Sequence, residues 1–385
     1  MPWGSRRRFI KIVGAGGAVA ALGGYALSRV DAMPPEAVEA WQGPRQDEPD
    51  PRRWILGHAI LAPNPHNMQP WIADLREPGA IDVRVDRDRL LPATDPFGRQ
   101  IVIGHGCFLE LARIAASARG LRAEIAYFPD GPMDGDALSD RRIARITLRD
   151  GAEPDPLFAQ VLARRSNKEP YDTERPVAAK HLATLAAEQL PDTVALTLEA
   201  APDRVRSLRE LTKAAMLVEL ATPAALAESV DRTRIGAAEI AAHRDGIDLH
   251  GPFFWLARQA GLMTRAKAMT PGTLAHQGGI DYATSYMESS MAFGWLETAA
   301  NDRPSQLDAG RAYVRLNLAA TAIGLGMHPL SQALQEYPEM SEPRRAVLRH
   351  TGTPADRHLQ MLFRMGYAPM PAPSPRRPIE DVIIA

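Results

Sequence analysis

The sequence predicts an α+β protein whose single chain contains two related halves. A long apolar helical run at residues 98–121 lies among short alternating strand patterns, and a second series of helices and strands begins at residue 151. Residues 115–121 are echoed by residues 319–325, and both segments end a long helical run with Gly-Leu. Because Ala-rich helices often look alike, the echo alone leaves common ancestry of the halves open.

The predicted elements divide the chain into consecutive parts. Residues 33–50 are polar and contain several prolines, which predicts an exposed lead-in. The N-terminal half then covers residues 51–150 and the C-terminal half residues 151–385. Strands are expected at residues 81–85, 124–128, 142–148, 194–199 and 358–366, and helices at residues 52–61, 98–121, 156–163, 177–189, 202–220 and 307–325.

The composition excludes several classes of function. The 385 residues carry 45 basic and 46 acidic side chains, so no overall positive field would attract nucleic acid. Cys107 is the single cysteine, which excludes an internal disulfide and a cysteine-based zinc site. Its apolar surroundings favour a buried thiol over a reactive one. No Ser-His-Asp or metal-binding constellation stands out, so we assign no catalytic side chain and no metal.

The N-terminus, residues 1–32, resembles a twin-arginine export signal. Paired arginines, Phe9, Ile10 and Lys11 precede an apolar stretch at residues 12–27, and small residues follow where a signal peptidase would cut. The resemblance implies a periplasmic or otherwise exported protein, moved by the twin-arginine translocase after folding and cofactor insertion. The alternative is a leader that is not cleaved and tethers the protein to the membrane.

Two motifs have the residue types expected of a cofactor site. The first is Ala-Pro-Asn-Pro-His-Asn-Met-Gln-Pro-Trp at residues 62–71, and the second is Arg-Arg-Ser-Asn-Lys at residues 164–168. Here the sequence resembles the nitroreductase family, and within it the long single-chain, Acg-like FMN-binding branch. Family members carry both motifs in the opposite order, about thirty residues apart. Further resemblance covers residues 308–311, 324–326, 364–367 and 376–380.

The second motif suits a phosphate. An FMN phosphate carries nearly two negative charges, and guanidinium forks, a hydroxyl and an ammonium are its natural donors. The motif supplies all three kinds in Arg164, Arg165, Ser166 and Lys168. The alternative is a solvated helix end, where arginines also interact well with the helix dipole.

The resemblance implies the remaining cofactor contacts. The loop that in the family contacts the flavin corresponds to residues 62–71, the backbone near the flavin N5 to Leu330 and Ser331, and the basic tail to residues 369–385. His66 could be either a turn residue or a base. The residues expected to bind FMN are Pro63, Asn64, His66, Asn67, Gln69, Arg164, Arg165, Ser166, Lys168, Leu330, Ser331, Arg376 and Arg377.

The distribution of the motifs indicates how many cofactors bind. The first half has the loop without an Arg-Arg-Ser cluster, and the second half has the cluster without a second loop. A family dimer builds each site from one cluster and the partner's loop. A nitroreductase-like pseudo-dimer with a single FMN, monomeric as a whole, is therefore expected.

Residues 243–279 contain aromatic residues and glycines and suit a lid over the flavin. Three functions remain open at this point. The chain could be an oxidoreductase that takes a hydride from NAD(P)H or another donor, a non-enzymatic protein that sequesters FMN beneath its lid, or a binding module whose flavin site has decayed.

Overall fold

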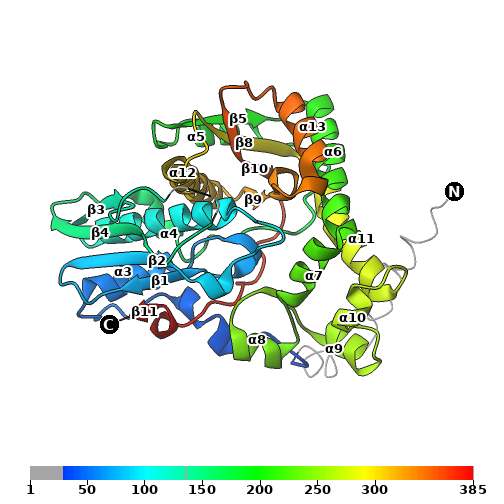
Figure 1. Ribbon diagram of the computed structural model, residues 1–385, viewed down its shortest axis with the longest axis horizontal. Coiled ribbons are helices and arrows are strands. Elements are labelled where there is room, and N and C mark those ends of the chain that lie inside the picture. Colours follow the sequence, from blue (N-terminus) through cyan, green and yellow to red (C-terminus); the bar gives the residue numbers. More distant parts are fainter. Residues whose placement is uncertain (1–28, 134, 136, 385) are drawn as a thin grey trace.

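The computed structural model describes residues 29–133, 135 and 137–384, so most of the predicted export signal lies outside the described residues. It confirms the predicted α+β class with mixed and antiparallel sheets. Figure 1 shows two sheets with the long helices α4 (Arg99–Ala118) and α12 (Arg303–Ala322) between them. Both helices were expected at almost these positions.

The first sheet is built mainly from the N-terminal half. Its strand order is β11-β1-β2-β4-β3, and all neighbours are antiparallel except β11 and β1. The strand β11 comes from the C-terminus of the chain, so the tail of the second half completes the sheet of the first. The elements are α3 (Pro51–Ala59), β1 (Trp71–Asp74), β2 (Ala80–Val85), β3 (Leu121–Tyr127), β4 (Arg142–Asp150) and β11 (Ile383–Ile384).

The second sheet repeats this topology. Its order is β5-β8-β10-β9, antiparallel throughout, with α12 between β8 and β9 just as α4 lies between β2 and β3. Strands β1, β2, β4 and β3 therefore correspond one by one to β5, β8, β10 and β9. The strands are β5 (Val194–Glu199), β8 (Ala292–Thr298), β9 (Gly326–Pro329) and β10 (His358–Gly366).

The second half carries extra helices. In Figure 1, α6, α11 and α13 lie on the side of the second sheet away from α12, and they enclose a separate apolar core against that sheet. Since both faces are covered, every residue of β8 is buried. The additional elements are α5 (Ala179–Ala186), α6 (Pro202–Ala221), α7 (Pro223–Asp231), β6 (Thr233–Ile235), α8 (Ala237–His243), β7 (Ile247–Leu249), α9 (Pro252–Gln259), α10 (Arg265–Ala268), α11 (Leu274–Glu288) and α13 (Ser341–Thr351).

The two central helices cross in close contact at glycines. A Cβ on Gly106 would lie 2.0 Å from the carbonyl oxygen of Leu307, and one on Gly310 would lie 1.9 Å from that of Ile103. The echoed glycines that follow these helices, Gly120 and Gly324, both have left-handed φ angles, +70° and +67°, as expected of helix C-termini. Within the described residues, α4 alone is long and apolar enough to cross a membrane, but it is mostly buried in the core.

Two sequence-based expectations need correction. The lead-in is not simply exposed, because Trp41 is buried and the amide of Arg376 donates to the carbonyl of Ala37. The helix expected at residues 156–163 is only a short 3-10 turn, η6 (Pro156–Gln160), after which the chain straightens toward the Arg-Arg-Ser motif.

The helix crossing gives a test of the fold. Gly310→Ala should lower the free energy of unfolding by about 1–3 kcal/mol, because its methyl group would collide with the α4 backbone. Urea unfolding followed by circular dichroism measures this. Gly278→Ala is the control, since α11 has open space at that residue and alanine should add up to ~1 kcal/mol of helix stability. Equal effects of the two substitutions would contradict the close crossing.

Candidate functional site

The Arg-Arg-Ser-Asn-Lys segment is fixed by its asparagine. The amide of Asn167 donates to the carbonyl of Met327 on β9 at 3.0 Å, and its side-chain amide donates to the carbonyl of Pro369 at 3.0 Å. Its own carbonyl accepts from the buried guanidinium of Arg364 at 3.1 Å. The segment is thereby held between the second sheet and the C-terminal tail.

Arg164 is fully buried and points toward the N-terminal half. Its Nη1 donates to Oδ1 of Asn317 on α12 at 2.9 Å, and its Nη2 donates to the carbonyl of Leu61 at 2.7 Å. Its buried Nε has no partner. Burial lowers the pKa of this guanidinium to about 10, so the charged form is held at an energetic cost.

The guanidinium groups of three arginines lie next to the indole ring of Trp41. The guanidinium of Arg165 lies 4.0 Å from the ring centroid, that of Arg376 4.9 Å and that of Arg164 5.6 Å. The indole Nε1 donates to the carbonyl of Ser374 at 2.8 Å, which sets the plane of the ring. An aromatic face stabilises nearby cations. Our sequence reasoning missed Trp41, and its only signal was a large aromatic residue within a polar lead-in.

Arg376 joins the cluster to the first motif. Its Nη1 donates to Oδ1 of Asn67 at 2.6 Å, and its Nη2 donates to the Leu61 carbonyl that also accepts from Arg164. Burial, together with the neighbouring charges of Arg164 and Arg165, lowers its pKa well below the ordinary value. The basic cluster of the second half and the loop of the first half therefore lie side by side.

The loop itself is strained and tightly braced. The backbone φ angles of His66, Asn67 and Gln69 are +47°, +54° and +52°. Residues other than glycine rarely adopt such angles. The amide of Gln69 donates to Oδ1 of Asn64 at 2.7 Å. Such strain persists only where surrounding contacts enforce it, and functional sites are where it concentrates.

The predicted lid contacts this loop directly. The amide of Gly246 donates to the carbonyl of Asn67 at 3.1 Å, and the side-chain amide of Gln69 donates to the carbonyl of Arg244 at 2.9 Å. Asp245 between them is buried and pairs with Arg89 and Arg234. The start of the lid segment is therefore bonded to the motif loop.

Lys168 and His66 are close enough for their charges to interact. The Lys168 side chain reaches the surface, and partial enclosure by surrounding protein lowers its pKa. Burial, together with the charges of Lys168 and Arg232, lowers the pKa of His66 to about 4. His66 is therefore neutral, and its buried Nδ1 has no partner.

The positive charges of this region lack counter-ions. Among the described residues, none of Arg164, Arg165, Lys168, Arg364 and Arg376 lies within ion-pair distance of a carboxylate, in a protein where most other arginines are paired. Asp248 exerts only a longer-range influence on Lys168 and Arg376. Buried charges are normally paired, so this cluster is suited to an anion supplied from outside.

Three predicted residues bond to other parts of the protein: Gln69 and Arg377 bond to each other, and Leu330 bonds to β10. Gln69 is fully buried and receives the amide of Arg377 at its Oε1, while the Arg377 guanidinium donates to the Gln69 carbonyl and pairs with Asp86 at 3.4 Å. Both residues fasten the tail to the loop, and the buried Nε of Arg377 has no partner among the described residues. The amide of Leu330 donates to the carbonyl of Leu362 at 2.8 Å, so it is not available to a flavin N5.

The remaining predicted residues are Ser331, Pro63 and Ser166. The amide of Ser331 meets no protein acceptor in the part of the chain that the structure describes. Pro63 is buried and stiffens the loop, and half-buried Ser166 follows directly after Arg165. The sequence analysis did not single out three residues of the region, which are Trp41, Asp248 and His328. The Nδ1 of His328 accepts a hydrogen bond from the Nε of Arg364 at 3.2 Å, and the charges of Arg364 and Lys168 contribute to lowering its pKa.

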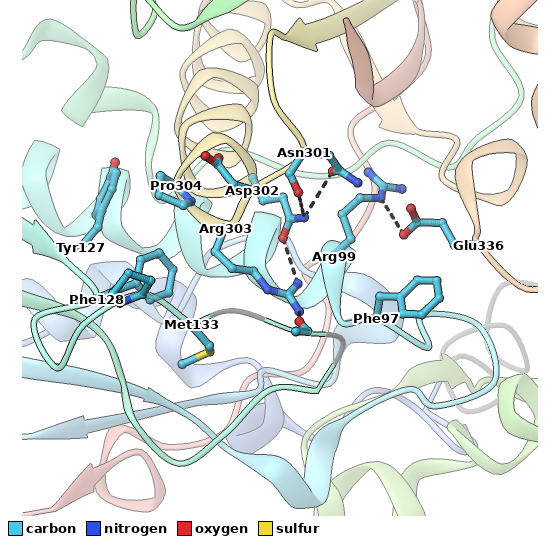
Figure 2. A pocket seen from close by; sticks show the side chains of 13 residues that line it. Phe97, Arg99, Tyr127, Phe128, Met133, Asn301, Asp302, Arg303, Pro304 and Glu336 are labelled. Atoms are coloured by element: carbon cyan, nitrogen blue, oxygen red, sulfur yellow. Dashed lines mark hydrogen bonds and ion pairs between the residues drawn. The ribbon is translucent and has the colours of Figure 1, made fainter. Parts of the chain in front are cut away.

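A separate cavity of about 700 Å³ lies between the halves, at the N-termini of α4 and α12. Figure 2 shows that its arginines are already engaged: Arg99 pairs with Glu336, and Arg303 donates to Gln306. Phe97, Phe128 and Met133 form much of the remaining wall. This cavity therefore lacks the uncompensated charge of the Trp41 cluster. The described residues contain no group of three or more His, Cys, Asp or Glu side chains that could hold a metal ion.

The chain is similar in sequence to proteins that are named as nitroreductases. No family model matches the chain. It is 27% identical over 337 residues to a Mycobacterium tuberculosis protein whose name assigns it to the NAD(P)H nitroreductases, covering 86% of this chain and 90% of that one. The M. tuberculosis protein Acg, which carries the same kind of name, is 27% identical over 345 residues, covering 84% and 92%.

Solved structures resemble the chain only distantly. A nitroreductase with bound FMN from Desulfitobacterium hafniense matches 60% of this chain and 98% of its own, with 13% identity and a TM-score of 0.37. The FMN-dependent nitroreductase NfnB of Mycobacterium smegmatis, in complex with NADPH, matches 57% and 92%, with 17% identity and a TM-score of 0.35. Scores this low carry no argument about fold or ligand.

The environment of His66 predicts a pH dependence of stability. Because the folded-state pKa of about 4 lies below the ordinary 6.5, the unfolded chain binds a proton in this range and the folded chain does not. The free energy of unfolding should therefore fall as the pH drops from 6.5 to 4. His66→Asn, which tolerates the left-handed backbone, should remove about 2 kcal/mol of that fall.

Urea unfolding at pH 7 and pH 4.5 measures the difference. His243→Asn serves as the control, because this histidine is exposed at the end of α8 and should leave the pH dependence as in the wild type. An unchanged pH dependence in the His66 variant would show that the histidine is not enclosed as described.

Proposed function

We propose that the chain binds one FMN and acts as an oxidoreductase of the nitroreductase type. The observation that carries this proposal is the cluster of guanidinium and ammonium groups without counter-ions, which lies against the strained loop at residues 62–71. The similarity to named nitroreductases over most of the chain supports the same function.

The residues present fit the phosphate end of FMN. Arg164, Arg165 and Arg376 each have a buried Nε without a partner, and all three surround one indole ring. A dianion would neutralise buried charge and accept hydrogen bonds from such groups at once. Arg164 and Arg376 also hold the loop through Leu61 and Asn67, so they position the site in addition to carrying charge.

We place the ring end of FMN beside Lys168 and His66. Of the two residues expected near the flavin N5, Leu330 and Ser331, only Ser331 has an amide without a protein acceptor among the described residues, so we propose it as the donor near a reduced flavin. When bound, FMN supplies hydride and electron transfer, while the protein orients it and tunes its potential. His66 is neutral, so it would add no charge to the ring's surroundings.

The repeat of the fold supports a pseudo-dimer with a single site. Counting back two residues from the equivalent pair Ala115 and Ala319 makes Arg113 the counterpart of Asn317. Where Asn317 binds Arg164 in the candidate site, Arg113 pairs instead with Asp155 at 2.9 Å and Glu110 at 2.6 Å. The protein's own carboxylates therefore occupy the position related by the repeat.

The loop equivalent to residues 62–71 also joins this network. Glu188, between α5 and β5, pairs with Arg315, which in turn pairs with Asp155 at 2.7 Å. A fully internal ion-pair network leaves no uncompensated charge there for a second phosphate. We infer one FMN for each chain, and no second subunit is needed to complete the site.

FMN sequestration is the alternative function, and the lid favours it. The lid backbone is bonded to the loop at Asn67 and Gln69, so a flavin bound beneath it would be covered. The two functions differ in whether NAD(P)H can reach the ring.

We further propose that residues 1–32 direct export through the twin-arginine translocase to the periplasm, with the cofactor inserted before transport. Fractionation of cells that produce the chain tests this, and recovery of the full-length protein only from the cytoplasm would contradict it.

The phosphate assignment predicts a selective loss of affinity. Arg165 donates only to the neighbouring carbonyls of Leu162 and Arg164, so Arg165→Ala leaves the motif loop in place. FMN affinity, measured by fluorescence quenching, should fall about 10- to 100-fold, as expected for a charged hydrogen bond. Riboflavin, which lacks the phosphate, should bind the variant and the wild type alike.

Arg206→Ala is the matched control, because this exposed arginine pairs only with Asp203 on α6. Equal weakening of FMN and riboflavin by Arg165→Ala would contradict the phosphate contact. A wild-type protein that purifies colourless and cannot be reconstituted with FMN would contradict the whole proposal.

The lid predicts how turnover responds to loosening. Asp245→Asn removes the charge that holds Arg89 and Arg234, so the lid should open more often. We expect the wild type to oxidise NADPH with a quinone or nitroaromatic acceptor, and the variant to do so with a kcat/KM at least about tenfold higher. Asp281→Asn, on the exposed side of α11, is the control. FMN-loaded protein without turnover in either form would favour sequestration.

A further inference from the structure

The lid presents an unusual surface. Exposed large hydrophobic side chains are concentrated between residues 253 and 274, in and around α9 and α10, whereas elsewhere in the described chain they are scattered singly. Leu256 is 63% exposed and Leu274 60% exposed. The full set comprises Phe253, Trp255, Leu256, Leu262, Met269 and Leu274. A concentration of this kind marks an interaction site.

The same segment has no acidic residue. From residue 249 to residue 280 the charged side chains are Arg258, Arg265 and Lys267. Two of them have acidic neighbours, since Arg265 pairs with Glu239 at 2.7 Å and Arg258 lies 3.8 Å from Asp31. Lys267 donates only to a backbone carbonyl, that of Gly261. Exposed Trp, Phe and Leu beside basic residues are typical of helices that lie in a membrane interface.

The described part of the chain begins at this surface. Asp31 is bonded to the lid and its neighbour, because its carbonyl accepts from the amide of Gly251 at 2.8 Å and its Oδ1 accepts from the amide of Ala237 at 2.8 Å. In the sequence this point is preceded by the apolar residues 12–27, which follow several arginines and a lysine.

We propose that the exposed face of α9 and α10 rests on the surface of an anionic phospholipid membrane. The apolar side chains enter the interface, and Lys267 faces the anionic headgroups. Figure 1 places α9 at the periphery of the molecule, far from the C-terminal strand β11, so the membrane contacts one end of the molecule. This surface is independent of whether FMN binds.

The test has to report on the lid itself, because residues 12–27 alone could bind lipid. Cys107 is fully buried and burial raises its pKa to about 12, so a cysteine introduced at Leu256 is the single reactive thiol of the full-length chain. An environment-sensitive NBD label there should become several-fold brighter and shift to the blue with vesicles of phosphatidylglycerol and phosphatidylcholine. Vesicles of phosphatidylcholine alone should give a smaller change.

The matched control is the same label on Ile384→Cys, an exposed position on β11, which should change little. No response at position 256, or equal responses at both positions, would overturn the proposal. A concentration-dependent response without vesicles would overturn it as well, because it would show that a second copy covers the surface. As a second variant, Leu256→Asp should reduce flotation with anionic vesicles at least threefold relative to Ile384→Asp; equal flotation would contradict the assignment.

Discussion

The site depends on an electrostatic imbalance that the protein alone does not relieve. Three arginines share one indole ring, and one carbonyl oxygen of Leu61 accepts from two of them. Within the described part of the chain, no carboxylate lies within ion-pair distance of the group. Burying such charges is costly, and the lowered guanidinium pKa values express that cost. A folded protein accepts it where a bound anion completes the network. The loop at residues 62–71, the tail at residues 369–377 and the lid are all arranged around this cluster.

The repeat explains how the imbalance comes to be confined to one side. The two sheets have the same strand order and the same central helix, and the helices meet where glycines allow backbone contact. At the position related by the repeat, Glu110, Asp155 and Glu188 form ion pairs with Arg113, Arg311 and Arg315. The two positions related by the repeat therefore differ in charge pairing. In one, the arginines are paired with carboxylates of the protein, and in the other they form a cationic cluster without carboxylate partners among the described residues.

The segment at residues 243–279, predicted as a lid, extends from the motif loop to the outside of the molecule. One end is bonded to the strained loop through Gly246 and Arg244, and the other end carries the exposed apolar side chains of α9 and α10. Between the two ends, Asp245 pairs with Arg89 and Arg234, and Arg265 pairs with Glu239.

The sequence by itself determined the α+β class, the two central helices and the two motifs, because these depend on local periodicity and on clustered residue types. It could not reveal that Trp41 underlies the arginines, that Gln69 and Arg377 secure the tail, or that the amide of Leu330 is used by the sheet. Those roles depend on contacts between residues hundreds of positions apart, such as Trp41 with Ser374 and Arg376 with Asn67. Only the tertiary structure decided which charges remain unpaired, because pairing is a property of distance in space and leaves no periodic trace along the chain.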